Sequence, residues 1–189
     1  MNELILKRRS TVLFSSKEID KDIIQDLFNA ARWAPSSMNQ QPWRFIYVLK
    51  GDSQYDGLLS CLAEKNQQWA KNAPLLLLTV AQVISDYNDR ENIYAWHDTG
   101  MSYANLVFQA TCEGLSVHPM GGFDREKTKL VAAIPERFEP VVFAAIGYKS
   151  DSNDFSHELL ERENSKRVRK PLKDFLFHGK FGNKSDLGN

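Results

Sequence analysis

The sequence predicts an α+β fold organised as a single domain. Three short apolar segments bounded by proline or glycine are typical of buried strands. Two longer segments place their apolar residues at the 3.6-residue period of a helix. The chain has 189 residues, of which 42% are hydrophobic, and this length suits one domain with a sizeable core.

The first predicted helix begins near Asp20, a residue type favoured at helix N-termini, and ends before Pro35. Its apolar face consists of Ile23, Ile24, Leu27, Phe28 and Ala31. The segment APSSMNQQPWRF, residues 34–45, follows as a polar loop between an apolar helix and an apolar strand. Such a loop either presents polar groups to a ligand or forms an ordinary helix-to-strand turn.

Three segments are predicted to form buried strands. They are Arg44–Lys50, Leu75–Ala81 and Pro140–Tyr148. Each is short, apolar and flanked by Pro or Gly, which favours a strand over a helix.

A helix over residues 97–115 is predicted to be apolar on more than one side. One face consists of Met101, Ala104, Val107, Phe108 and Cys112, and Leu106 and Ala110 add a second. Such a helix must be covered on more than one side, as the central helix of a domain or at a subunit interface. Gly114 is placed to end it, and a shorter amphipathic helix at roughly Asp124–Ala133 precedes the third strand.

The charge balance and the cysteine positions argue against several kinds of binding partner. The 24 Lys and Arg residues balance the 24 Asp and Glu residues, so no global field attracts nucleic acid or an anionic membrane. Cys61 and Cys112 show no metal-like spacing near the four histidines, so we expect two buried thiols in a reducing compartment and no metal. The longest apolar run, residues 74–81, is too short to span a bilayer, and the first ten residues lack a signal-peptide run. We expect a soluble cytoplasmic protein without nucleic-acid or membrane partners.

Two basic clusters and one glycine pair are candidate sites for chemistry. KRRST at residues 7–11 combines three cations with two hydroxyls, and SKRVRKPLKDF at residues 165–175 holds five cations. Arg side chains bind phosphate oxygens in pairs, although either cluster alone is also typical of a solvated basic surface. In PMGGF, residues 119–123, the glycines permit a backbone N–H to approach a flat ligand or simply form a turn.

Several nucleotide-binding and catalytic motifs are absent from the sequence. It contains no GxGxxG and no GxxxxGK, which argues against a Rossmann site and a Walker phosphate loop. It also contains no GxSxG, HExxH or CxxC. Basic clusters without a glycine-rich phosphate loop indicate a monophosphate held by side chains.

Six segments follow one another in an order and spacing that resemble the nitroreductase family of FMN-dependent oxidoreductases. They are RRS at 8–10, APSSMNQQPWRF at 34–45, NQQWAKNAP at 66–74, DTGMSYANL at 98–106, GLSVHPMGGFD at 114–124 and RKPLKDF at 169–175. The segments are spread over residues 8–175, so the resemblance covers nearly the whole chain.

The resemblance implies a central, mostly antiparallel sheet flanked by helices, in a single FMN-binding domain over residues 1–189. Residues 157–189 would form a C-terminal dimerisation arm that reaches the partner subunit of a homodimer with shared active sites. Hydride would pass from NADH or NADPH through flavin N5 to a small-molecule acceptor, by a ping-pong mechanism. The acceptor would be a nitroaromatic, a quinone or an activated alkene. No catalytic side chain and no metal are implied, because N5 and solvent supply the protons.

The resemblance also assigns the cofactor-binding residues. The phosphate and polar edge of FMN would be bound by Arg8, Arg9, Ser10, Arg167 and Arg169, with Arg8 or Arg9 stabilising the anionic reduced flavin. The segment along the isoalloxazine would be Pro119, Met120, Gly121 and Gly122, with a backbone N–H near Gly121 facing N5. Gln67 or Gln68 would reach the pyrimidine end of the ring. The flavin of the partner chain would be contacted by Pro35, Ser36, Ser37 and Asn39, while Gln41, Pro42 and Trp43 fix this loop.

Two positions depart from the pattern of the family. Val12 stands where the family usually has a second cation, so one polar contact to the flavin is missing. Gly121 replaces a Glu found in some members, so the substrate preference of those members does not carry over. His118, beside the flavin segment, either donates a proton or has a structural role.

Two other functions are compatible with the same residues. One is a specialised relative, such as a dehalogenase or a flavin-degrading enzyme, although the short stretch over residues 82–96 leaves little room for the extra lid of such enzymes. The other is a non-catalytic FMN-binding protein. A globular protein that merely carries basic surface patches would be colourless.

Overall fold

The centre of the structure is a sheet of four antiparallel strands. The computed structural model describes residues 1–188, and its strands are β1 (Trp43–Leu49), β2 (Leu75–Gln82), β3 (Ser116–Met120) and β4 (Phe138–Gly147). Their order is β1-β2-β4-β3, and each neighbouring pair is antiparallel. All eight residues of the central strand β2 are buried. The three predicted strands and the antiparallel sheet are confirmed.

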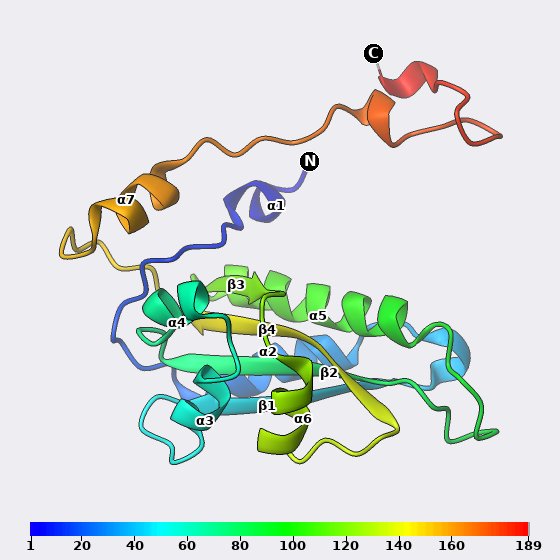
Figure 1. Cartoon of the computed structure of the whole chain (residues 1–189). Coiled ribbons are helices and arrows are strands. Elements are labelled where there is room, and N and C mark those ends of the chain that lie inside the picture. The colour runs from blue at the N-terminus through cyan, green and yellow to red at the C-terminus, as the bar shows by residue number, and fades with distance from the viewer. Residues whose placement is uncertain (189) are drawn as a thin grey trace.

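Helices cover both faces of this sheet (Figure 1). They are α1 (Glu3–Lys7), α2 (Lys21–Arg32), α3 (Tyr55–Leu59), α4 (Glu64–Ala70), α5 (Ala95–Cys112), α6 (Arg125–Val131) and α7 (His157–Asn164), with 3-10 turns η1 (Ser37–Asn39), η2 (Leu172–Asp174) and η3 (Asp186–Gly188). Successive side chains of a strand point to opposite faces. Leu76 and Leu78 of β2 therefore pack with residues of α3 and α4, and Leu75 and Leu77 pack with residues of α2 and α5. The sheet separates two hydrophobic layers.

Three of the predicted local features are confirmed. Helix α2 follows Asp20, and Ile24, Leu27 and Ala31 on its predicted apolar face are buried. Gly114 has a φ of +73°, a left-handed conformation that suits glycine at the end of α5. At α6, the Asp124 side chain accepts a hydrogen bond from the backbone N–H of Lys127 and so caps the helix.

Helix α5 has two apolar faces, and the single chain covers only one of them. Leu106 and Ala110 are fully buried, whereas Met101 and Phe108 are 37% and 42% exposed. Cys112, on the same side of the helix as these two, is exposed as well. The prediction of two buried thiols is therefore wrong for Cys112, because its side of α5 points away from the sheet; Cys61 is buried as expected.

The sequence does not predict β3, whose residues it assigns to the loop after α5. Pro119 lies within this strand and cannot donate to a hydrogen-bond ladder, so the segment does not read as a strand. Among residues 1–188, β3 pairs only with β4 and forms one edge of the sheet, where proline is tolerated. The strand leads to Gly122, whose carbonyl oxygen accepts a hydrogen bond from the backbone N–H of Ala63 at 2.9 Å. The segment after β3 is thereby held beside the start of α4.

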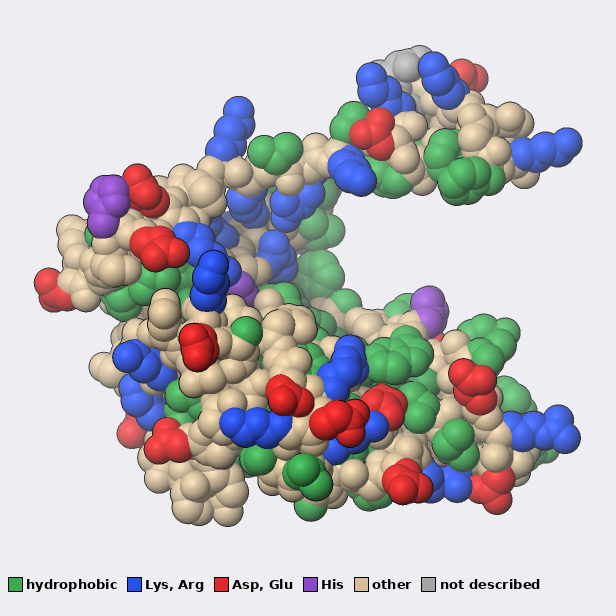
Figure 2. Space-filling model, in the orientation of Figure 1, with side chains coloured by type: hydrophobic (Ala, Val, Ile, Leu, Met, Phe, Trp, Pro, Cys, Tyr) green, Lys and Arg blue, Asp and Glu red, His purple; other side chains and the backbone are tan. Residues whose placement is uncertain are grey.

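After β4 the chain leaves the sheet and runs outward. Helix α7 packs Leu159 and Leu160 against the body, and the following segment, residues 165–188, projects away from it (Figure 1). Figure 2 shows open space between this segment and the body. Phe175 and Phe181 are exposed in it, so the chain itself leaves apolar side chains uncovered there. Of the predicted arm, only Asn189 lies outside the described residues.

No helix within residues 1–188 combines the length and the apolar character needed to cross a membrane.

Candidate functional site

Three guanidinium groups lie together where the N-terminal segment meets the chain after α7. Arg8 donates from Nη1 to Oγ of Ser10 at 3.2 Å. Arg167 donates to the carbonyl oxygens of Arg8 at 2.9 Å and of Leu6 at 2.7 Å. Burial, and then the nearby positive charges of Arg169 and Arg167, lowers the pKa of Arg8 below its ordinary value. The structure thus brings together Arg8, Arg167 and Arg169, which we call the arginine cluster.

Within residues 1–188, no carboxylate forms an ion pair with any member of the arginine cluster. Guanidinium groups held together without a counter-charge repel one another, and an anion between them relieves this repulsion and accepts paired hydrogen bonds. The buried hydroxyl of Tyr103 has no hydrogen-bond partner in the described chain and lies near enough to Arg8 for that charge to affect its pKa. The arrangement is chemically suited to an anion.

Arg9 does not join the arginine cluster. Its Nε lies 3.7 Å from Oε1 of Glu163, and its Nη2 donates to the carbonyl oxygen of Ser165 at 3.1 Å. The guanidinium of Arg9 is therefore already engaged within the chain. Val12, where a cation was expected from the family pattern, is 1% exposed and belongs to the hydrophobic core.

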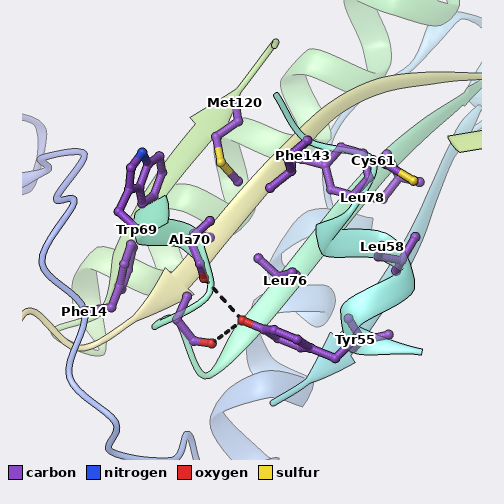
Figure 3. Packing of buried hydrophobic residues seen from close by; sticks show 14 of the residues in the cluster. Phe14, Tyr55, Leu58, Cys61, Trp69, Ala70, Leu76, Leu78, Met120 and Phe143 are labelled. Carbon is purple, nitrogen blue, oxygen red and sulfur yellow. Dashed lines mark hydrogen bonds between the residues drawn. The ribbon is translucent and has the colours of Figure 1, made fainter. Parts of the chain in front are cut away.

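The residues predicted to lie along the flavin ring are the last two of β3, Pro119 and Met120, and the two glycines that follow. Met120 is buried among core residues such as Phe143 (Figure 3), whereas Pro119 is exposed. Neither Gly121 nor Gly122 has a left-handed φ, so a glycine-requiring turn does not explain the pair. A Cβ at Gly121 would meet open space, and one at Gly122 would lie 3.3 Å from a side-chain atom of α4. Gly121 therefore leaves a smooth stretch of open backbone.

The two glutamines of α4 differ in what they contact. Gln67 donates from Nε2 to the carbonyl oxygen of Leu62 at 2.6 Å, so its amide is used within its own segment. Gln68 lines a cavity of about 320 Å³ between α4 and α7, together with Trp69 and Arg162. Of the two candidates, Gln68 is the one whose side chain faces a cavity.

The loop over residues 34–42 is held in a strained conformation. Met38, Asn39 and Gln41 have φ values of 52°, 54° and 48°, which are uncommon for residues other than glycine. Oγ of Ser36 accepts from the N–H of Gln41 at 3.0 Å, and Asn39 accepts from the Gln41 side chain. The N–H of Ser37 donates to Oδ2 of Asp98, a buried residue at the start of α5, at 2.9 Å. Each such backbone conformation costs about 1–3 kcal/mol and persists when its surroundings impose it, often at functional sites.

The single chain does not bring this loop to the arginine cluster. The loop lies beside the start of α5, and the N-terminal segment crosses the other side of the molecule (Figure 1). Among residues 1–188, no hydrogen bond joins the loop to residues 8–10 or 119–122. The predicted site residues therefore form two separate groups within one protomer.

His118 has a structural role in the chain. Its Nδ1 lies 2.7 Å from the carbonyl oxygen of Thr11, which can only accept, so Nδ1 carries a proton. Nε2 faces Nη2 of Arg162 at 3.4 Å. Burial lowers the pKa of His118, the hydrogen bond to Thr11 opposes this, and the charge of Arg162 adds to the lowering. His118 is thus a neutral link between β3, the N-terminal segment and α7.

Two carboxylates that organise the site were not found from the sequence. Asp98 anchors the strained loop, and Glu163 holds the N-terminal segment. Both are buried. An acidic residue on the apolar side of a helix must be paired with hydrogen-bond donors when it is buried. This placement is the signal in the sequence that could have identified the two carboxylates, but it does not show which donors they bind.

Comparison with known proteins adds the family. A model of the nitroreductase family matches residues 5–148. A protein of Archaeoglobus fulgidus named "Putative NADH dehydrogenase/NAD(P)H nitroreductase" is 27% identical over 176 residues, which are 89% of this chain and 95% of that protein. An uncharacterized 15.4 kDa protein of Mycolicibacterium smegmatis is 31% identical over 125 residues, 66% of this chain and 83% of that protein. A crystal structure described as an oxidoreductase containing FMN has a TM-score of 0.89 and 34% identity, over 97% of this chain and 94% of that chain. The chain belongs to the nitroreductase family.

Proposed function

We propose that the protein is an FMN-dependent oxidoreductase that passes hydride from NADH or NADPH to an electrophilic small molecule. The acceptor class is nitroaromatics, quinones or activated alkenes. The observation that carries the proposal is the arginine cluster of Arg8, Arg167 and Arg169, which has no carboxylate partner in residues 1–188. The FMN named for the similar crystal structure and the NAD(P)H named for the Archaeoglobus relative support the choice of cofactor and donor.

The residues present fit the two chemically distinct ends of FMN. A phosphate monoester carries about −1.5 to −2 charges at pH 7, and three guanidinium groups neutralise it. Both Nη atoms of Arg167 donate to backbone carbonyls, whereas the hydrogen bonds of Arg8 and Arg169 within residues 1–188 use Nη1, which leaves their other N–H groups for the phosphate. The open backbone at Gly121 suits the close approach of a flat ring, because no side chain of its own intervenes. The sequence motifs of adenosine-binding loops are absent, which favours FMN over FAD.

Bound FMN would supply the redox chemistry, since the flavin accepts and donates hydride. The chain's own residues bind and orient it. We assign Arg8, Ser10, Arg167 and Arg169 to the phosphate and the backbone of residues 119–122 to the ring. Gln68 suits the pyrimidine end better than Gln67, whose amide already donates to Leu62. No side chain is assigned as a general base.

We infer that the working form is a homodimer whose sites each use both chains. Pro35, Met38 and Asn39 of the strained loop are exposed and lie away from the arginine cluster of their own chain. The uncovered face of α5 and the projecting segment also leave large apolar side chains exposed, as at Phe108 and Phe175. Exposed apolar patches of this kind are typical of subunit interfaces. In this dimer the loop over residues 34–42 would contact the flavin of the partner, and residues 157–189 would form a dimerisation arm.

The spectrum of the purified protein tests the proposed function. We expect a yellow protein that releases FMN rather than FAD on denaturation, and whose absorbance bleaches anaerobically when NADH or NADPH is added. Reoxidation by a nitroaromatic, a quinone or an enal then reports the acceptor. A colourless protein that cannot be reconstituted with FMN would refute the proposal. Bound FMN that no donor reduces would instead indicate a non-catalytic flavin-binding protein.

A further inference from the structure

The segment from Leu6 to Val12 is held mainly by side chains from elsewhere in the chain. Arg167 binds the carbonyl oxygens of Leu6 and Arg8, and His118 binds that of Thr11. The N–H of Val12 donates to Oε2 of Glu163 at 3.1 Å. Leu6 lies in the last turn of α1, and from Arg8 on the segment contains no helix or strand up to the bridge at Phe14. Its position, and with it the position of Arg8, therefore depends on these contacts.

Glu163 makes the most buried of these contacts. Only 3% of its side chain is exposed. Oε2 accepts from Oγ of Thr11 at 2.8 Å as well as from Val12, and Oε1 lies 3.3 Å from Nζ of Lys149 and 3.7 Å from Nε of Arg9. Burial alone would raise the pKa of this carboxyl, but the hydrogen bonds from Thr11 and Val12 and the nearby positive charge of Lys149 outweigh it, and the pKa lies below its ordinary value. Oε2 is thus held by two hydrogen bonds, whereas Oε1 faces two cations and has no hydrogen-bond partner within residues 1–188.

We propose that Glu163 is a positioning residue of the flavin phosphate site and that Arg9 is its counter-ion rather than a phosphate ligand. The proposal rests on the proposed function, because it concerns the site assigned to FMN. Glu163 precedes Arg167 by four residues and binds Thr11, three residues after Arg8. One buried carboxylate therefore ties together the two segments that carry the arginine cluster.

The orientation of Arg9 supports the second half of this assignment. Its Nε faces the carboxylate and its Nη2 is used by the carbonyl of Ser165, so its fork of donors is directed at α7 and the residue after it. To reach a phosphate, Arg9 would have to give up its ion pair with the buried carboxylate and its hydrogen bond to Ser165. Glu163 would then keep Lys149 as its one cationic neighbour, and weakening the pairing of a buried charge is unfavourable. Arg8, Arg167 and Arg169 have no such carboxylate to leave.

Glu163 could affect FMN affinity through its negative charge or by positioning the arginine cluster, and removing the carboxylate changes the affinity in opposite directions in these two cases. Glu163→Gln keeps the size and one acceptor oxygen but removes a negative charge near a bound anion. If Glu163 acted only through its charge, FMN would bind more tightly in this variant. If Glu163 positions the cluster, FMN binds more weakly, and riboflavin, which lacks the phosphate, binds as in the natural protein.

The experiment is a fluorescence titration of the apoprotein with FMN and with riboflavin. We expect Glu163→Gln to lower the preference for FMN over riboflavin about threefold to tenfold, the scale of one or two net hydrogen bonds. An unchanged or increased preference would overturn the positioning role. If Glu163→Gln does not fold, as judged by circular dichroism, Thr11→Val removes one hydrogen bond to the same carboxylate with little change of shape and is expected to lower the preference in the same direction.

Arg9 is tested in a double-mutant cycle. As a counter-ion, Arg9→Gln should weaken FMN binding much less when Glu163→Gln is also present, and Arg9→Lys should retain most of the affinity because it keeps the charge beside Glu163. As a phosphate ligand, Arg9→Gln would weaken FMN binding by the same factor in both backgrounds, which would overturn this assignment. A natural protein that binds no FMN would refute the proposed function itself, whereas FMN binding unaffected by Glu163→Gln would refute only the present inference.

Discussion

Replacing Arg169 with glutamine tests whether this cation binds the ligand or stabilises the folded protein. The guanidinium of Arg169 donates to the carbonyl oxygen of its neighbour Val168 at 2.8 Å, and its charge, together with that of Arg167, acts on Arg8. Within residues 1–188 no carboxylate pairs with it. In the free protein this charge is therefore mainly repulsive, and it becomes favourable only when an anion is bound.

The expected changes have opposite signs for binding and for folding. A hydrogen bond to a charged group contributes about 1.5–3 kcal/mol, so Arg169→Gln should weaken FMN binding about 10-fold to 150-fold. Riboflavin affinity should not change. The free energy of unfolding of the apoprotein should stay within about 0.5 kcal/mol of the natural value, as for other exposed substitutions, and any shift should be toward higher stability because a like charge is removed.

Flavin fluorescence titration and urea unfolding of the apoprotein measure these two quantities. Lys170→Gln is the matched control, because it removes the same charge from the next residue, and it should weaken FMN binding far less. Equal losses for both variants would mean that only the overall charge of the segment matters. An FMN affinity that Arg169→Gln leaves unchanged would place the phosphate elsewhere and refute the reasoning from the arginine cluster.

Three further outcomes follow from the same structure. Phe108→Asp, on the uncovered face of α5, should leave the far-ultraviolet circular dichroism unchanged but shift the protein from dimer to monomer in analytical ultracentrifugation; an unaffected dimer would exclude this face from the interface. Steady-state kinetics should give parallel double-reciprocal lines, because donor and acceptor use one flavin in turn, and intersecting lines with both substrates bound together would argue for two separate pockets. The pKa of Glu163 is lower in the folded protein than in the unfolded chain, where it has its ordinary value of about 4.3. The ionised carboxylate therefore contributes its full stabilisation at a pH above about 4.3, and this stabilisation is lost as the pH falls through the pKa of the folded protein. The difference in unfolding midpoint between the natural protein and Glu163→Gln should therefore shrink in acid, and a difference that stays constant from neutral to acid pH would contradict this.

Local patterns in the sequence predict most of the fold. The apolar run of β2 and the periodicity of α2 specify those elements, because their side chains pack against their own neighbours in the sheet layers. Strand β3 is not predictable in the same way, since it is short and contains Pro119, and its place depends on pairing with β4. The exposure of Cys112 could not be deduced either. The sequence pattern of an apolar helix face is the same whether that face packs against its own chain or against another molecule.

The candidate site is predictable in its composition but not in its pairing. The basic residues near both ends of the chain indicate an anion site, and the structure brings Arg8, Arg167 and Arg169 together across a long sequence separation. The ion pair between Arg9 and Glu163 could not be predicted, because the two residues are far apart in the sequence and only the tertiary fold brings them together. The strained conformation of the loop is also not predictable from the sequence, because bonds within the loop act together with the hydrogen bond from Ser37 to Asp98, which is distant in the sequence.

Dimers that combine two different variants test whether each FMN site is built from both chains. One chain carries Arg169→Gln, which damages the phosphate side, and the other carries Ser37→Ala with Asn39→Ala, which damages the loop side. At an FMN concentration that just saturates the natural protein, each variant should lose most of its activity as a homodimer, whereas a purified heterodimer has one doubly damaged site and one intact site. We expect about half of the natural activity for that heterodimer, because one site of two is restored. A demonstrated heterodimer without activity, or a loop variant that is fully active alone, would contradict it.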